Sequence, residues 1–506
     1  MLLSVQRSKI FTEFTEREQK YWFGIKEKAV AHHIDTLYYN VFIKNDCNDN
    51  KYAGMQAFLA ELKDLRDKKR LNKDMPYELS EFMVEMGGAG GNIYLYHLTI
   101  PEFYDVFVTD YLPNDKTPRI HVQLRTKALI EKGLYGSIEE SFGAVKTLLS
   151  EYNLQIFYCD INRIDYAFHT NVIQRPSVEF DDEKIARHLD STFIDGTKHF
   201  YLRRNIDQDN RFDMDYLALG NRKSNNIFFR CYEKSKEVIE KNYKGFFLKR
   251  WRDRGLISRY DEYVYTVAYQ YGTFKTGVLM GRVQWYLEHG EDPELRAELS
   301  ELIMKCNVES SNNKFIEDKI RGVLPPVTLI MNFEFETKRK YYARQQGFID
   351  FYNYEHKGPA ELEDIYKILD MRRFFIHRLT SETVAFREDG ADPESPMLDY
   401  WKRIHRCRIE GIPDKEEFES YYTYSKSIDA SRMRTRWMNA TAAYSIMLRG
   451  DIDAKALEQD IFEIVSRIND NDLEGNYREI NGKDYRFIRK RKGRMLKSMI
   501  KKMNKK

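Results

Sequence analysis

The chain has 506 residues, of which 42% are hydrophobic and 14% aromatic. That is enough apolar material for a large core in two or three domains, and it excludes a disordered chain. The 82 basic residues are nearly balanced by 79 acidic ones, so the net charge of +3 does not by itself indicate a nucleic-acid partner.

The cysteines and the apolar runs exclude further classes. The five cysteines stand far apart with no Cys-x-x-Cys pair, so neither a disulfide framework nor a zinc ribbon is indicated. No run reaches the roughly 18 to 20 apolar residues that span a bilayer. We therefore expect a cytoplasmic protein with no membrane partner.

The N-terminal part of the chain predicts a mixture of helices and strands. Residues 1–30 predict a short lead-in helix. A strand is predicted over 34–43, which is rich in aromatic and β-branched residues, and a lysine-rich amphipathic helix over 53–70. The Gly87–Gly91 run predicts a loop that leads into a strand over 92–100.

Three later segments alternate apolar and polar residues, the pattern of strands that have one face in a core. They are 119–125, 162–169 and 226–232, and a helix is predicted over 138–152 between the first two. A fourth strand is predicted to begin near Ser258. The polar faces of these strands carry His121 and Gln123; Arg163, Asp165 and His169; Arg230 and Tyr232; Arg259 and Asp261.

Strands separated by helices and long loops predict an α+β fold, with an antiparallel-type β-sheet domain and flanking helices over 31–270. From 271 to 485, apolar residues at three- and four-residue spacing predict a mainly helical region, to which the family resemblance described below assigns DNA or partner binding. The predicted helices there are 290–305, 360–381, 398–409, 414–428 and 433–468. Residues 486–506 form a basic tail without acidic residues, suited to phosphate contacts.

Neighbouring strands would bring these polar sets together on the open face of the sheet. Asp165 with His169 or Gln123 would then hold a divalent cation, which polarises a phosphodiester as a Lewis acid. A phenol has an ordinary pKa of about 10, so Tyr232 needs positive charge or a base nearby to act as a nucleophile.

Each of these residues also has a purely structural interpretation. A tyrosine on a strand usually packs, and Asp165 beside Arg163 would form a simple ion pair. A single histidine such as His169 is more often structural than a ligand, and the basic tail would equally be a solvated end. From the residues alone, the sequence indicates a phosphate or DNA enzyme and no more.

Three segments carry family motifs in a fixed order. Ile161–Phe168 contains an Arg-hydrophobic-Asp-hydrophobic-Ala pattern, and Asp215–Asn226 is similar to a Tyr-x-Gly-Ser-Arg stretch. The latter runs into Ile227–Glu237, which contains Arg-x-Tyr-x-Lys-x-x-Glu. Together they resemble the trans-acting replication initiation factor family (Rep_trans), which contains rolling-circle plasmid initiators and relaxases of conjugative elements. Residues 34–37 resemble its opening strand and Ile257–Asp261 its Trp-Arg-x-Glu strand, so the resemblance covers roughly half the chain.

The resemblance implies roles for the matching residues. Tyr232 is the nicking nucleophile, with Arg230 and Lys234 stabilising its phenolate. Glu237 is a metal ligand or base. The implied ligands of Mg²⁺ or Mn²⁺ are Asp165, Glu237, Asp261, Gln123 and His169, of which the last three replace acidic residues of relatives. The basic residues expected to hold DNA are Arg163, Arg222, Lys223, Arg489, Lys490, Arg491 and Lys492.

The implied activity is replication initiation by a nuclease domain that nicks one strand of an origin. The nick leaves a 5′-phosphotyrosyl intermediate and a 3′-hydroxyl that primes rolling-circle replication. Implied partners are double- and single-stranded origin DNA, a second copy of the chain, and a host helicase and polymerase. Three alternatives stay open: a relaxase that nicks at a transfer origin, a non-enzymatic sequence-specific DNA-binding regulator, and a hydrolytic metallonuclease.

Overall fold

The computed structural model describes residues 28–409 apart from short gaps, which are 45–52, 87–92, 112–117, 175–179, 181, 192–200, 207–211, 224, 241–243, 272–275, 311–326, 353 and 356–357. Several predicted features therefore lie outside the described residues. These are the lead-in segment up to residue 27, the Gly87–Gly91 loop, the helices over 414–428 and 433–468, and the basic tail with Arg489, Lys490, Arg491 and Lys492.

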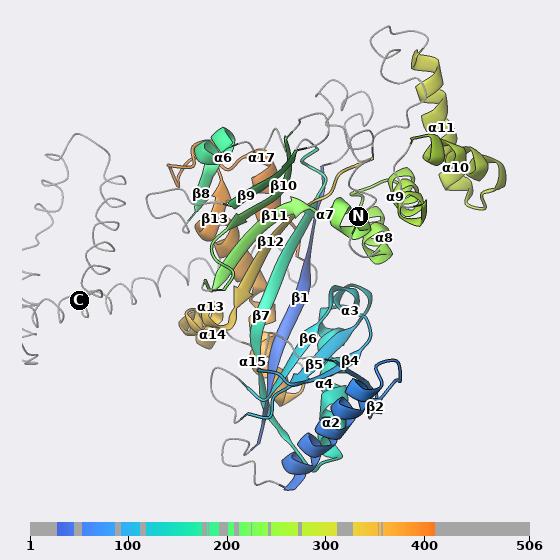
Figure 1. Cartoon of the computed structure of the whole chain (residues 1–506). Helices are drawn as coiled ribbons and strands as arrows, with labels where there is room; N and C mark the ends of the chain where they lie inside the picture. Colours follow the sequence, from blue (N-terminus) through green and yellow to red (C-terminus); the bar gives the residue numbers. More distant parts are fainter. Residues whose placement is uncertain are drawn as a thin grey trace, which may run out of the picture. The chain divides into compact units, whose positions relative to one another are not determined.

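Within the described part of the chain, eleven strands form one antiparallel sheet in the order β2-β3-β4-β5-β6-β1-β7-β12-β11-β10-β9 (Figure 1). This confirms the predicted α+β class. The strands are β1 (Val30–Ile43), β2 (Glu78–Leu79), β3 (Phe82–Glu85), β4 (Tyr96–Ile100), β5 (Tyr104–Val108), β6 (Ile120–Leu124), β7 (Ile156–Thr170), β9 (Tyr201–Ile206), β10 (Phe212–Leu219), β11 (Ile227–Glu233) and β12 (Met331–Lys338); β8 (Leu189–Ser191) and β13 (Val384–Phe386) form a separate pair.

The long strands β1 and β7 join the two halves of the sheet. They pair along almost their whole length and run side by side from β4–β6 to β11 and β12 (Figure 1). The pairing contains irregularities near Ile34 and Tyr38, where one strand carries an extra residue. Such bulges increase the local twist and allow one pair of strands to serve two differently oriented halves.

The helices within the described ranges flank this sheet. They are α2 (Ala53–Leu71), α3 (Thr126–Glu131), α4 (Leu134–Ser150), α6 (Asp182–His188), α7 (Lys234–Glu240), α8 (Gly245–Asp253), α9 (Arg259–Tyr271), α10 (Thr276–His289), α11 (Pro293–Ser310), α13 (Arg339–Ala343), α14 (Gln346–Phe351), α15 (Glu363–Asp370), α16 (Arg372–Arg378) and α17 (Asp399–His405), with a 3₁₀ turn at Ala360–Leu362 and a π-helical turn at Leu379–Thr383. None of them is long and apolar enough to cross a membrane.

The predicted boundary at residue 270 does not mark the end of the sheet. Strand β12 lies between β7 and β11, yet it comes from the region that was predicted to be mainly helical. Its sequence alternates polar Asn332, Glu334 and Glu336 with buried Phe333 and Phe335, which is the two-residue period of a strand. The region after 270 thus contributes a central strand as well as helices.

The strand predicted near Ser258 is wrong, because this segment begins helix α9. The Ser258 hydroxyl accepts a hydrogen bond from the backbone N–H of Asp261 at 3.1 Å, and the Asp261 carboxylate accepts one from the Ser258 N–H at 2.9 Å. This reciprocal pair is a capping box, which satisfies two of the unpaired N–H groups at a helix start. The local hydrogen bonds therefore favour a helix over a strand.

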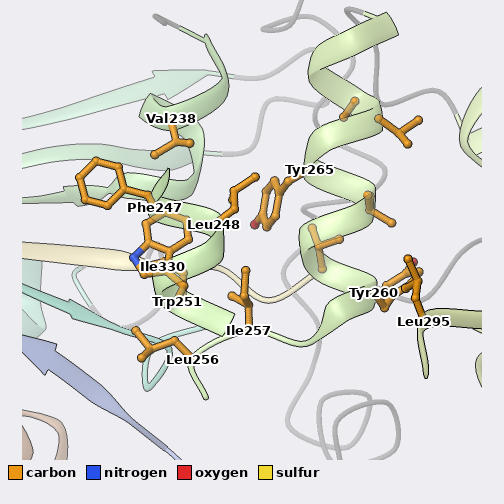
Figure 2. Close-up of a cluster of buried hydrophobic side chains, with 14 of the residues drawn as sticks. Val238, Phe247, Leu248, Trp251, Leu256, Ile257, Tyr260, Tyr265, Leu295 and Ile330 are labelled. Atoms are coloured by element: carbon orange, nitrogen blue, oxygen red, sulfur yellow. The ribbon is translucent and has the colours of Figure 1, made fainter. Parts of the chain in front are cut away.

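Helices α7–α11 form an insertion between β11 and β12 with a core of its own. Figure 2 shows Trp251 and Phe247 of α8 beside Tyr265 of α9 within one cluster of buried side chains. The Trp251 indole N–H donates to Nδ1 of His169 on β7 at 2.8 Å, which ties this core to the sheet. The insertion therefore covers one end of the sheet face that carries His169.

The opposite face of the sheet is the main apolar core. Phe335 of β12 is fully buried, with its ring centroid 4.9 Å from that of Phe229 on β11 and 6.3 Å from that of Phe168 on β7. Trp401 of α17 closes this cluster at 6.4 Å from Phe335. The pairing of β12 is thus supported by aromatic packing on this side.

We expect Phe335→Ala to lower the free energy of unfolding by about 3 to 5 kcal/mol, because it leaves a cavity among the rings of three elements. Phe157→Ala is the matched control: its ring is 64% exposed, and its loss should change stability by only about 0.5 kcal/mol. Urea unfolding followed by circular dichroism measures both. Equal effects for the two variants would show that β12 is not packed as described.

Candidate active site

Three neighbouring strands place a row of polar side chains on one face of the sheet. The register sets Tyr232 of β11 opposite Asn332 of β12, and Arg230 opposite Glu334. Residues that pair directly across an antiparallel sheet point to the same side. We call this side of β7, β12 and β11 the site face.

Strand β7 completes the site face. Asp165 lies opposite Glu336, and His169 lies opposite Asn332. Arg163 is two residues from Asp165 and shares its face, as the alternation in the sequence predicts. The structure therefore brings residues from three distant parts of the chain into one surface.

The phenol oxygen of Tyr232 sits at the centre of a hydrogen-bond network. It accepts from Nδ2 of Asn332 at 3.0 Å and from Nζ of Lys234 at 3.3 Å, and it donates to Oε2 of Glu334 at 3.3 Å. In this arrangement the acceptor can take the proton of the phenol. The two donors can then stabilise the phenolate that is left.

Charges of both signs act on the phenol of Tyr232. Burial raises the pKa of its phenol well above the ordinary value; the charge of Lys234 opposes this rise and the charge of Glu334 adds to it. Arg230 lies with its guanidinium carbon 5.3 Å from the centre of the Tyr232 ring and also forms an ion pair with Glu334. The phenol is therefore protonated at rest and needs an adjacent base to act as a nucleophile.

Lys234, the first residue of α7, is buried beneath the phenol with two carboxylates. Its Nζ lies 2.6 Å from Oε2 of Glu237 and 3.8 Å from Oδ1 of Asp35 on β1. Burial lowers the pKa of Lys234, but the charges of Asp35, which contributes most, and of its other neighbours together outweigh burial and leave this pKa well above its usual value. Asp35 is thus a positioning residue that keeps the Lys234 cation under Tyr232.

A second ionic cluster lies further along the site face. Arg163 donates from Nε to Oδ1 of Asp165 at 2.7 Å and pairs with Glu336 at 2.9 Å. Arg222 also donates to Glu336, at 2.8 Å. Burial raises the pKa of Asp165 to about 7; Arg163 opposes this, and the nearby Glu334 and Glu336 carboxylates increase it.

The predicted metal ligands do not converge. Asp165 is held by Arg163, and Glu237 is held by Lys234 and by Lys244 at 2.8 Å. Asp261 lies in the capping box of α9 and accepts from Thr328, so it is not part of the Tyr232 network. No group of three or more His, Cys, Asp or Glu side chains among the described residues is arranged to hold a metal ion.

The other two predicted ligands have different surroundings. His169 is buried; its Nδ1 accepts from Trp251, and its ring lies 4.4 Å from the ring of His33. Burial lowers the pKa of His169 well below its usual value, so the imidazole is neutral. Gln123 of β6 lies in register with Tyr38 of β1, near Arg163 rather than Tyr232. A requirement for Mg²⁺ or Mn²⁺ stays a prediction from the family resemblance.

Among the residues expected to hold DNA, Arg163 and Arg222 lie on the rim of the site face in ion pairs with Glu336. Lys223 is exposed in the turn between β10 and β11, which begins with Gly220 at a φ of 85°. A side chain at that φ would strain the backbone, so the glycine allows the tight return that starts β11.

Glu334, Asn332 and Asp35 were missed from the sequence. The first two lie on β12, whose alternating pattern was present but fell in a stretch predicted as helical. Asp35 belongs to the predicted first strand, and no motif singled it out. A search for two-residue periods after 270 would have found Glu334.

Comparisons with known proteins give little further information. No protein-family model matches the sequence, and no curated protein matches it. Among solved structures, a rolling circle replication initiator protein from Geobacillus stearothermophilus aligns with 76% of this chain and 100% of its own, at 12% identity and a TM-score of 0.32. A similarity this low does not indicate the fold or the activity of this chain.

We expect Asp165→Asn to remove a pH-dependent loss of stability. The folded protein holds the Asp165 proton up to a pKa of about 7, whereas the unfolded chain releases it near pH 4. The parent must therefore lose stability as the pH rises between these values, and the variant must lose less. Urea unfolding from about pH 4 to about pH 8 without divalent ions measures the difference. A difference that does not change with pH would contradict the raised pKa.

Proposed function

We propose that this chain is a DNA strand transferase that nicks one strand through Tyr232 and initiates rolling-circle replication. The observation that supports this most directly is the phenol oxygen held between two donors and a carboxylate on a sheet face. The motif resemblance points to the same tyrosine. A tyrosine that only packs has no need for three polar partners, one of which is a buried lysine.

In the proposed reaction the Tyr232 oxygen attacks a phosphodiester phosphorus. Its proton passes to Oε2 of Glu334, a new oxygen–phosphorus bond forms, and the bond from phosphorus to the 3′ oxygen breaks. The 3′ oxygen leaves with a proton from solvent as a 3′-hydroxyl, and the protein stays on the 5′ phosphate. Lys234 and Asn332 stabilise the developing charge on the tyrosine oxygen. Arg230, whose guanidinium carbon lies 5.3 Å from the centre of the Tyr232 ring, is the group that we assign to a non-bridging phosphate oxygen.

A covalent intermediate suits this function better than hydrolysis. The phosphotyrosyl bond conserves the energy of the broken phosphodiester, so a later attack by a DNA 3′-hydroxyl can reseal the strand. The released 3′-hydroxyl is meanwhile a primer for synthesis. Dimer formation and contacts with a helicase and a polymerase are part of the proposal and rest on the family resemblance alone.

The first prediction concerns the covalent product. Supercoiled DNA that carries the cognate origin, incubated with the protein and Mg²⁺ or Mn²⁺, should yield an adduct that survives denaturing gels and maps by mass to Tyr232. Tyr232→Phe should abolish the adduct and keep DNA binding. Tyr269→Phe is the matched control. The Tyr269 ring is exposed on α9, so this substitution should change neither adduct formation nor DNA binding.

Each outcome of this experiment distinguishes one class of function from the others. A nick without an adduct would indicate a hydrolytic nuclease, and DNA binding without a nick would indicate a regulator. An adduct formed at a transfer origin but not at a replication origin would indicate a relaxase. An adduct that forms equally in chelator would contradict the expected cation requirement.

The second prediction tests Glu334 as the base. Glu334→Gln keeps the hydrogen-bond geometry but removes the basic oxygen, so single-turnover adduct formation should slow by about 100- to 10,000-fold. Glu262→Gln is the control: this carboxylate pairs with Arg252 at 2.6 Å on the helical insertion, outside the network. Both variants are checked by thermal unfolding. An unchanged rate in a folded Glu334→Gln protein would exclude this residue as the base.

A further inference from the structure

Three buried side chains beside the Tyr232 network hold polar atoms that have no hydrogen-bond partner among the described residues. These atoms are Nε2 of His169 on β7, Oδ1 of Asn332 on β12 and Nδ1 of His33 on β1. The three residues are 1%, 0% and 7% exposed, so solvent at the surface does not reach them. An unpaired polar group costs free energy in such a place and needs an explanation.

The proton of His169 is placed by Trp251. An indole N–H can only donate, so its 2.8 Å hydrogen bond to Nδ1 of His169 requires that nitrogen to be unprotonated. Burial lowers the pKa of His169 well below its usual value, so the ring is neutral and carries a single proton. That proton is therefore on Nε2. The unpaired Nε2 is a hydrogen-bond donor, and it has no lone pair left to offer a cation.

The amide of Asn332 is fixed in one orientation by its other neighbours. One end lies 3.0 Å from the Tyr232 oxygen and 3.0 Å from Oε2 of Glu334. The Glu334 carboxylate, which is paired with Arg230, only accepts, so this end of the amide is the nitrogen. The amide oxygen is turned away from Tyr232 of β11. On the other side of β12, the residue in register with Asn332 is His169.

One buried water molecule between His169 and Asn332 would satisfy both unpaired atoms. Residues in register on antiparallel strands have Cβ atoms about 5 Å apart, so these two side chains are neighbours. A water accepts from the Nε2–H group of His169 and donates to Oδ1 of Asn332. The ring of His33, whose centroid is 4.4 Å from that of His169, offers a third polar neighbour. Buried waters make about three hydrogen bonds, which matches this site.

We propose that His169 is a positioning residue for the Tyr232 reaction, which holds the Asn332 amide through this buried water. The contacts run from the Trp251 indole through His169 and the water to Asn332, and from there to the phenol oxygen. They hold the end of Asn332 that does not touch the nucleophile, so that its N–H group stays on Tyr232 as the phenolate forms. This inference rests on the proposed function, because it explains how that phenolate is stabilised.

The first measurement locates the proton of His169 without any DNA. Full-length protein labelled with ¹⁵N-histidine is studied by NMR, and the His169 signals are identified by their loss in His169→Gln. We expect a protonated Nε2 and an unprotonated Nδ1 from about pH 5 to about pH 8. A proton on Nδ1, or on both nitrogens, would overturn the proposal.

The second measurement is the rate of single-turnover adduct formation at saturating supercoiled DNA with Mg²⁺ or Mn²⁺. His169→Leu removes the donor and should slow this rate by about 5- to 100-fold without changing DNA affinity. His169→Gln, whose amide N–H reaches the place of Nε2, should restore most of the rate. His32→Leu is the control: this buried β1 histidine bonds to the Ala167 carbonyl on the opposite face of the sheet, and its loss should leave the rate unchanged.

A double-mutant cycle separates positioning from a general loss of structure. If His169 acts through Asn332, then His169→Leu should cause no further slowing in protein that already carries Asn332→Ala. Slowing by the full factor in both backgrounds would overturn the proposal, as would an unchanged rate in folded His169→Leu. Thermal unfolding checks each variant. Trp251→Phe, which frees the His169 proton to move to Nδ1, takes the place of His169→Leu in the cycle if that variant does not fold.

Failure of this inference and failure of the proposed function give different results. In protein labelled with ¹³C-tyrosine, the Cζ signal that is lost in Tyr232→Phe reports the hydrogen bonds of the phenol without DNA. This signal should move in the same direction in His169→Leu as in Asn332→Ala. If it does so while the unmodified protein forms no adduct, nicking is excluded and the positioning role stands. If an adduct forms but His169→Leu leaves the signal unchanged, nicking stands and the positioning role is excluded.

Discussion

The pairing of β12 with β7 on one side and β11 on the other holds the candidate site together. Tyr232 comes from β11, its hydrogen-bond acceptor Glu334 from β12, and Asp165 from β7, so none of their distances is fixed until these strands are in register. A shift of β12 by one residue would turn Glu334 to the apolar side and place a phenylalanine beneath the phenol. The aromatic packing of Phe335 on the other side of the sheet resists such a shift.

The site face also shows how a protein keeps many charges in a small buried volume. Glu334 is fully buried, and an unpaired carboxylate there would cost several kcal/mol. Arg230 pairs with it, just as Lys234 pairs with Asp35 and Glu237. Alternating signs across neighbouring strands let each charge stabilise the next. The charged side chains are therefore held in fixed positions by their own ion pairs.

Much of this architecture follows from local sequence patterns, and the rest depends on distant contacts. Alternation predicted the strands that became β6, β7 and β11, and with them the common face of Arg163 and Asp165. The same period was present in β12, but a short alternating run among helices gives no indication of which strands it will join. The segment after Ser258 was predicted as a fourth strand of the series, although its Ser-x-x-Asp spacing is that of a helix start. The pairing of Lys234 with Asp35 could not be predicted, because only the folded sheet brings Asp35 to it.

The helical insertion leaves the sheet after Glu233 and returns at Met331, and these two residues lie opposite each other on adjacent strands. Because its two ends are already side by side, the length of the intervening chain hardly affects the closure of the sheet, whose entropic cost grows only with the logarithm of loop length. Helices α9–α11 can thus be lengthened, shortened or exchanged over evolution while the strands of the candidate site stay paired, whereas α7 and α8 supply Lys234 and Trp251 to the contacts of the site face. The outer helices of the insertion are therefore the part of the protein that can change most without altering the hydrogen bonds around Tyr232.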